Sequence, residues 1–61
     1  MDRNLVIANI KENMQKIYNA FGIIENCLLQ NKLDDIDYAI VLSKKSLDSI
    51  VVDLNKLKNE G

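Results

Sequence analysis

An apolar side chain recurs at alternating spacings of three and four residues between Ile7 and Leu28. This spacing is a heptad repeat, in which the apolar a and d positions form one stripe along a helix. A strand cannot use the pattern, because its successive side chains point to opposite faces. The repeat therefore predicts a long helix that packs against other helices. Its a and d residues, in chain order, are Ile7, Ile10, Met14, Ile17, Phe21, Ile24 and Leu28.

A second heptad repeat follows in a different phase. Asn31 interrupts the first repeat, and asparagine can adopt the left-handed conformation that ends a helix. The β-branched runs at residues 40–42 and 50–52 could form strands if taken alone, but the heptad spacing continues through both. We expect helices over residues 3–30 and 35–58, with a connection at 31–34. The second repeat consists of Leu33, Ile36, Ile40, Ser43, Leu47, Ile50, Leu54 and Leu57.

A short connection between two long helices predicts an all-α antiparallel hairpin, with residues 1–61 as a single domain. A chain of this length buries little surface and usually needs a disulfide, a metal or a partner subunit. Cys27 is the only cysteine, so we expect a homodimer in which two hairpins form a four-helix bundle. The interface residues expected are Ile7, Ile10, Met14, Ile17, Phe21, Ile24, Leu28, Ile36, Ile40, Leu47, Ile50, Leu54 and Leu57.

The ends of both helices carry capping residues. Asp2 or Asn4 can cap the first helix, and Asp34 or Asp35 can cap the second. Asp37 adds negative charge to the first turn of the second helix, where it complements the helix dipole. Three acidic residues in one first turn are explained better by these effects than by metal binding.

Three further residues lie on or beside the heptad positions. Gly22 is expected to be an exposed helical glycine, although it could also mark a kink or a close approach by a partner backbone. Cys27 flanks the first repeat and is expected to be a buried apolar filler rather than a reactive thiol. Ser43 is the polar residue of the second repeat and can hydrogen-bond to the preceding turn or fix the register.

The composition argues against several functions. The net charge is −1, so nothing draws the chain electrostatically to nucleic acid or to an anionic membrane. With no histidine and one cysteine, we expect no metal, no cofactor and no catalytic residue. The polar N-terminal residues resemble neither a signal peptide nor a membrane span. We expect a cytoplasmic protein, and its richness in asparagine and lysine fits an AT-rich bacterial or phage genome.

Exposed apolar and aromatic side chains remain beside the repeats, and helical faces of this kind bind other proteins. We therefore expect a small non-enzymatic regulator that binds another protein as an inhibitor, an antitoxin-like protein or an adaptor. The residues expected to face the partner are Tyr18, Tyr38, Val41, Val51 and Val52.

Residues 45–56 resemble the second helix of the small sporulation-regulating aspartyl-phosphate phosphatases, which are helical hairpins with a Ser-Gln-x-Leu-Asp signature. Leu47 and Asp48 match the end of that signature. The resemblance implies that Asp48 would be placed against the phosphoaspartate of a response regulator. Lys44 and Lys45 occupy the serine and glutamine positions, and the connection lacks the usual glycine of that family.

Nucleic-acid binding is a second alternative. Small plasmid-encoded RNA-binding proteins are dimers of helical hairpins, so the architecture is compatible with RNA, although a fold does not determine a function. The basic residues here are dispersed and balanced by acidic ones, without interleaved aromatic residues. We therefore expect a solvated surface at these residues, which are Arg3, Lys11, Lys16, Lys44 and Lys45.

Overall fold

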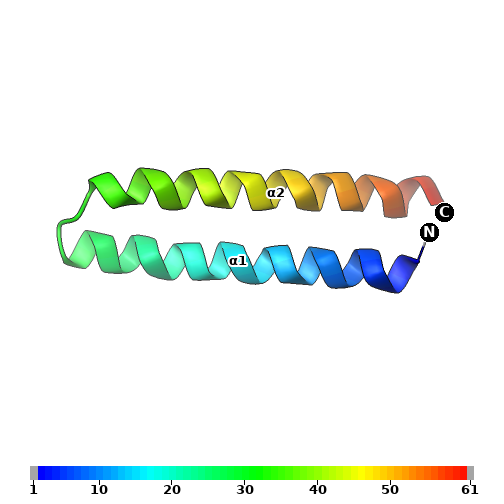
Figure 1. Ribbon diagram of the computed structural model, residues 1–61, viewed down its shortest axis with the longest axis horizontal. Coiled ribbons are helices and arrows are strands. Elements are labelled where there is room, and N and C mark those ends of the chain that lie inside the picture. Colours follow the sequence, from blue (N-terminus) through cyan, green and yellow to red (C-terminus); the bar gives the residue numbers. More distant parts are fainter. Residues whose placement is uncertain (1, 61) are drawn as a thin grey trace.

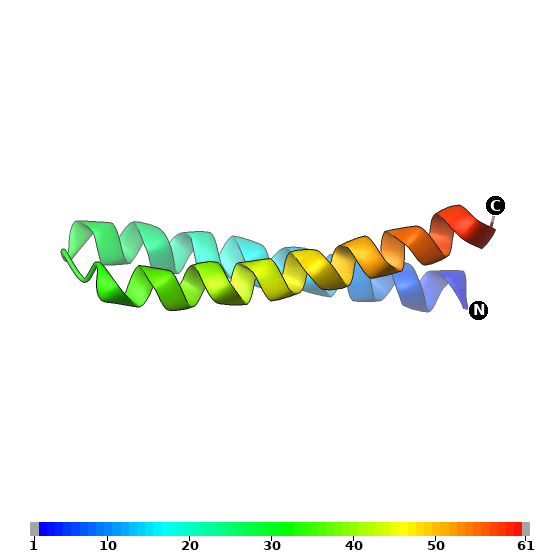
Figure 2. The same ribbon diagram turned by 90° about the horizontal axis from the view of Figure 1, so that it is seen from above.

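The protein is a two-helix hairpin. A computed structural model describes residues 2–60, with helix α1 at Arg3–Leu29 and helix α2 at Asp34–Glu60. The helices lie side by side in antiparallel orientation and contact each other along their length, as Figures 1 and 2 show from two directions. Residues 40–42 and 50–52 are helical rather than extended. The predicted all-α hairpin is therefore confirmed.

Asp2 caps the start of α1. Its side-chain Oδ1 accepts hydrogen bonds from the backbone N–H groups of Asn4 (3.0 Å) and Leu5 (3.3 Å). These N–H groups have no partner within the helix, so the carboxylate stabilises the first turn. Of the two expected caps, the structure uses Asp2, and Asn4 lies within the helix.

The connection between the helices is built around Asn31, which has a φ of 56°. The Lys32 N–H donates to the Cys27 carbonyl (2.8 Å), and the Asn31 N–H donates to the Leu28 carbonyl (3.3 Å). This pair of bonds is the Schellman motif, which satisfies the last carbonyl groups of a helix through one left-handed residue. The left-handed conformation expected at Asn31 is confirmed.

The expected capping of α2 by Asp34 or Asp35 is wrong. The helix begins at Asp34 itself, and the Ile36 N–H donates to the Leu33 carbonyl at 3.2 Å. Asp34 and Asp35 instead lie in the first turn together with Asp37, while Lys58 lies in the last turn. In these places their charges complement the helix dipole without capping the helix.

The hairpin is too extended to form a compact core. Its radius of gyration is 14.3 Å, whereas about 10.5 Å is typical of a compact domain of this length. Its accessible surface is 4802 Å² for a mass of 7.0 kDa, against about 4,000 Å² for a typical folded monomer of that mass. The described residues include no large side chain that is fully buried. Two helices alone therefore leave much apolar surface uncovered.

Candidate functional site

The contact between the helices is made by two heptad rows on each helix. On α1, one row is half-buried Ile10, Ile17 and Ile24, which are the predicted d positions. The other row lies one position before each predicted a residue and contains mostly small or polar side chains. The two helices can therefore approach closely, because these side chains are short. We call these second rows the small rows, and they are Val6, Asn13, Ala20 and Cys27 on α1, and Ala39, Ser46 and Asp53 on α2.

The predicted a positions of both helices point away from this contact. Phe21 is 54% exposed and Leu47 is 50% exposed. Each a residue follows a residue of the small row by one position, which is about 100° around its helix axis. Because α2 runs antiparallel to α1, the same sense of rotation brings both sets to one broad side of the hairpin. We call this side the apolar face, and its residues are Ile7, Met14, Phe21, Leu28, Ile40, Leu47 and Leu54.

The structure thus divides the interface residues predicted from the sequence. Ile10, Ile17 and Ile24 on α1 are half-buried, as are Ile36 and Ile50 on α2. Leu57 is half-buried near the open end of the hairpin, where Arg3 Nη1 lies 3.7 Å from Glu60 Oε2. The other predicted residues belong to the apolar face and lack cover within the hairpin, apart from half-buried Ile7.

The predicted partner-facing residues lie in two places. Tyr18 (64% exposed) and Val51 each follow a residue of the helix contact by one position, and they border the apolar face. Tyr38, Val41 and Val52 are exposed on the outer side of α2. Val41 and Leu42 follow Tyr38 by three and four residues, so both side chains lie beside Tyr38 on the helix surface. We call Tyr38, Val41 and Leu42 the α2 patch.

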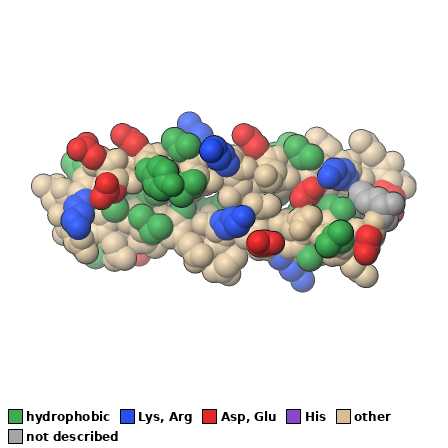
Figure 3. Space-filling view, in the orientation of Figure 1, with side chains coloured by type: hydrophobic (Ala, Val, Ile, Leu, Met, Phe, Trp, Pro, Cys, Tyr) green, Lys and Arg blue, Asp and Glu red, His purple; other side chains and the backbone are tan. Residues whose placement is uncertain are grey.

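Figure 3 shows one broad side of the hairpin, on which hydrophobic side chains gather over the first half of α2. Elsewhere on this side, charged and other polar side chains separate the hydrophobic ones. Neither α1 nor α2 is both long and apolar enough to cross a lipid bilayer.

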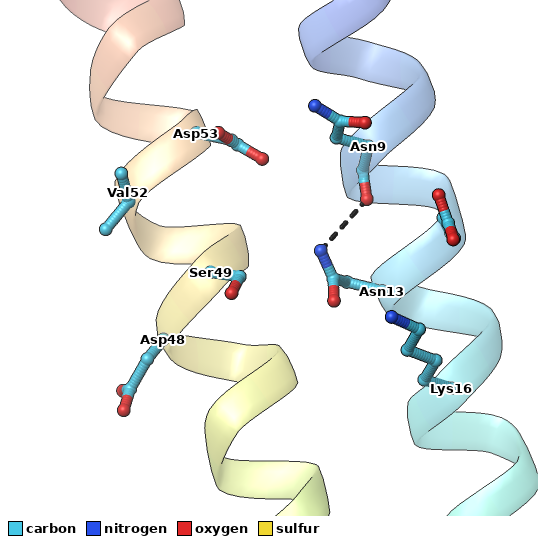
Figure 4. A pocket seen from close by; sticks show the side chains of 8 residues that line it. Asn9, Asn13, Lys16, Asp48, Ser49, Val52 and Asp53 are labelled. Atoms are coloured by element: carbon cyan, nitrogen blue, oxygen red, sulfur yellow. Dashed lines mark hydrogen bonds between the residues drawn. The ribbon is translucent and has the colours of Figure 1, made fainter.

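Two shallow, open grooves of about 420 and 410 Å³ lie between the helices. In the first groove, Figure 4 shows Asp53 and Ser49 of α2 directed toward α1, with Asn9 and Asn13 opposite them. Asn13 donates a side-chain hydrogen bond to the Asn9 carbonyl at 3.1 Å. The second groove is lined by Ile23, Leu42, Lys16 and Lys45 among others. Both grooves are open, unlike the enclosed pockets that bind small molecules; the first is lined by polar and apolar surface in similar measure and the second mainly by apolar surface.

Asp53 is a residue that the sequence analysis missed. It is 8% exposed although it is charged, and its Oδ1 lies 3.5 Å from Lys56 Nζ one turn later. The available signal was the seven-residue spacing of Ala39, Ser46 and Asp53, because small or polar residues at a heptad position indicate a close helix contact. Asp53 therefore belongs to the helix contact rather than to an external site.

Asp48 lies on the side of α2 that faces away from α1, as Figure 4 shows, and it is exposed. It borders the first groove beside Ser49, with Lys16 across the groove on α1. Lys44 and Lys45 are exposed as well. Asp48 is therefore accessible to another protein, while the interior of the groove is occupied by amide, hydroxyl and carboxylate groups.

The remaining residues noted in the sequence are Cys27, Ser43 and Gly22, and the structure explains each by its place in a helix. Cys27 is 7% exposed within the helix contact, as expected of an apolar filler. Ser43 Oγ donates to the Ala39 carbonyl at 2.9 Å, so the predicted bond to the preceding turn is confirmed. A Cβ added to exposed Gly22 would meet no atom within 4 Å, and α1 continues through this residue. Among residues 2–60, no three histidine, cysteine, aspartate or glutamate side chains are grouped to hold a metal ion.

Comparisons with models of protein families, with curated proteins and with solved structures gave no match for this chain.

Proposed function

We propose that this protein is a small cytosolic, non-enzymatic regulator that binds another protein through a helical face and works as a homodimer. One observation carries the proposal: the hairpin exposes two separate apolar surfaces, the apolar face and the α2 patch. A second copy covers the first surface, and the partner binds the second. An inhibitor, an antitoxin-like protein and an adaptor all use such a surface.

The exposed surface of the hairpin supports the dimer. In total, the hairpin exposes roughly 800 Å² more surface than a typical monomer of its mass, which is the share of one partner in a standard protein interface. The apolar face contributes exposed side chains such as Phe21 (54%) and Leu47 (50%), and soluble monomers rarely leave a large contiguous apolar patch open. Packing the apolar faces of two hairpins together produces a four-helix bundle with an apolar interior.

The α2 patch supports a protein partner. Tyr38 is 69% exposed, Val41 49% and Leu42 39%, and all three lie outside the apolar face. Spacings of three and four residues are the arrangement by which one helix presents anchors to another, and tyrosine is a frequent anchor of protein interfaces. We infer that the partner contributes the apolar side of a helix, laid along the outer side of α2.

Two variants of equal chemistry separate the two surfaces. Leu47 and Val41 are 50% and 49% exposed in the hairpin, but Leu47 lies on the apolar face and Val41 on the α2 patch. Leu47→Asp places a charge in the dimer interface, where an unpaired buried charge costs several kcal/mol. We expect Leu47→Asp to lose the dimer, as measured by sedimentation equilibrium, and Val41→Asp to keep it.

Partner binding is tested with the same pair. Tagged protein is used as bait in a bacterial lysate, with dimeric Val41→Asp as the matched control. We expect one stoichiometric protein that stays bound in high salt and is lost with Val41→Asp. Retention by Val41→Asp would overturn the α2 patch as the binding surface. Capture of nucleic acid that dissociates steeply with rising salt would favour the RNA- or DNA-binding alternative instead.

A further inference from the structure

The apolar face carries charges of both signs along its borders. The residue after each half-buried d residue of the two heptad repeats lies beside the apolar face, about 50° beyond it around the helix. On α1 these positions include Lys11, Tyr18 and Glu25, and on α2 they include Asp37 and Lys44, all of which are exposed. In a dimer through the apolar face, these residues meet their counterparts of the second copy. Their charges therefore report how the second copy is oriented.

Two symmetric arrangements bring the apolar faces together, because most homodimers have a two-fold axis and an isologous interface. In the same-end arrangement, the two-fold axis is parallel to the helices, the two connections lie at the same end of the bundle, and α1 packs on α2 of the second copy. In the opposite-end arrangement, the axis is perpendicular to the helices, the connections lie at opposite ends, and α1 packs on α1 of the second copy. All neighbouring helices are antiparallel in both cases, so helix direction does not decide between them.

The same-end arrangement brings like charges together. Glu25 and Asp37 lie about equally far from the connection on α1 and α2, and Arg3 and Glu60, which lie 3.7 Å apart at the other end, have the same register. Glu25 would therefore face Asp37 of the second copy, and symmetry repeats the contact. Like charges that face each other across an interface disfavour that arrangement.

The opposite-end arrangement pairs unlike charges. The axis lies midway between Met14 and Phe21, because the second copy then covers the apolar face along its whole length. Lys11 and Glu25 lie about equally far from this axis on opposite sides. Lys11 therefore faces Glu25 of the second copy, and symmetry again repeats the contact. Tyr18 lies at the axis and meets Tyr18 of the second copy, where two aromatic rings can stack.

The opposite-end arrangement has one unfavourable contact, between Lys44 and its own counterpart near the axis. Among the border charges, the opposite-end arrangement therefore has two attractive contacts and one repulsive contact. The same-end arrangement has two repulsive contacts between acidic residues, and Lys44 faces uncharged Tyr18 of the second copy. Border charges add little to affinity, but they select orientation and register.

We propose that the second copy covers the apolar face with its connection at the opposite end of the bundle, so that Lys11 faces Glu25 of the second copy and Tyr18 meets its counterpart. This inference rests on the dimer proposed above and deepens it. The α2 patches then lie on the outside of the bundle, near opposite ends, and each dimer has two separate sites for its partner.

A distance between the two connections tests the orientation. A spin label is attached at Lys32→Cys in a Cys27→Ala background, since Lys32 is exposed and Cys27 would otherwise compete. The opposite-end dimer places the labels about 40 Å apart, which is the length of a helix of 27 residues. The same-end dimer places them within roughly 20 Å, because neighbouring helix axes are about 10 Å apart. Pulsed electron resonance measures this distance.

Each outcome is decisive when the mass is measured on the same labelled sample. A dimer with the long distance supports the inference. A dimer with the short distance overturns the orientation but leaves the proposed dimer standing. A monomeric mass at tens of micromolar overturns both.

Charge reversal gives an independent test, because the same variant changes the dimer affinity in opposite directions in the two arrangements. Glu25→Lys removes attraction in the opposite-end dimer, so we expect the dimer dissociation constant to rise about fivefold at low salt. Adding Lys11→Glu should restore the wild-type value. In the same-end dimer, Glu25→Lys would instead relieve repulsion from Asp37 and tighten the dimer. Glu12→Lys, at an exposed position off the apolar face, makes the same change in net charge and serves as the control.

Discussion

Asp53 Oδ1 lies 3.5 Å from Lys56 Nζ, and the two side chains differ in environment: that of Asp53 is 11% exposed and that of Lys56 is 54% exposed. The carboxylate has been removed from most of its water by the helix contact, while its partner remains in solvent. Burial of a charge is costly, and an exposed partner offsets only part of that cost. Asp53 is therefore a position where the helix contact is less stable than it could be.

Replacing Asp53 by leucine should stabilise the fold. The leucine would extend the apolar contact between the helices and remove a partly desolvated charge, so we expect the free energy of unfolding to rise by about 1 kcal/mol or more. Urea denaturation at a fixed protein concentration measures the change. Glu12→Leu, at an exposed position, should change it by less than about 0.5 kcal/mol. A loss of stability in Asp53→Leu would show that the carboxylate makes a stabilising contact.

The left-handed residue of the connection gives a second prediction. Asn31 has a φ of 56°, a conformation that costs most residues roughly 1 kcal/mol but costs glycine little. Asn31→Ala should lower the free energy of unfolding by about 1 kcal/mol, while Asn31→Gly should match or exceed the wild type. Thermal denaturation of the two variants gives the comparison. Equal stabilities for alanine and glycine would contradict the role assigned to this conformation.

Gly22 and Ala8 occupy equivalent outward positions two heptads apart on α1, and both are exposed. Since a Cβ at Gly22 would meet no atom within 4 Å, Gly22→Ala should raise the free energy of unfolding by about 0.5 to 1 kcal/mol. Ala8→Gly should lower it by a similar amount. The two changes can be measured by urea denaturation. A destabilising Gly22→Ala would indicate that another backbone approaches Gly22 in the assembled protein.

Asp48 separates the regulator hypothesis from the phosphatase alternative. If the protein only binds its partner, adding it to a phosphorylated response regulator should leave the rate of phosphoryl loss unchanged. Wild type and Asp48→Ala should then give the same rate, because exposed Asp48 has no role in the fold. The measurement follows the phosphorylated regulator over time. Faster phosphoryl loss that disappears with Asp48→Ala would favour the phosphatase.

The sequence predicted the hairpin because its local signals agreed. The two heptad repeats indicated helices, Asn31 indicated the end of the first, and Asp2 or Asn4 indicated its start. Each signal depends on a preference of the residue itself or on spacing along one helix. These properties do not require knowledge of the neighbouring helix, which is why they could be derived from the chain alone.

The faces used by each helix could not be predicted in the same way. The a, d and small rows are adjacent on each helix, and the sequence shows only that the a and d rows are apolar. Which two rows meet depends on how closely the helices approach, and short side chains such as Ala20 and Ser46 allow a closer approach than Phe21 or Leu47. The helices therefore meet through the small rows rather than the a rows, which buries Asp53 and leaves the apolar face exposed.

Residues 2–60 include no large side chain that is fully buried, and this has a consequence for how much folded protein a cell contains. If the interior forms only between two copies, the folded fraction rises with the concentration of the chain itself. At low expression most chains would be unpaired and open to proteases, and a modest increase in synthesis would raise the surviving amount more than proportionally. Such a regulator would have a threshold set by its own dissociation constant, without any additional control element.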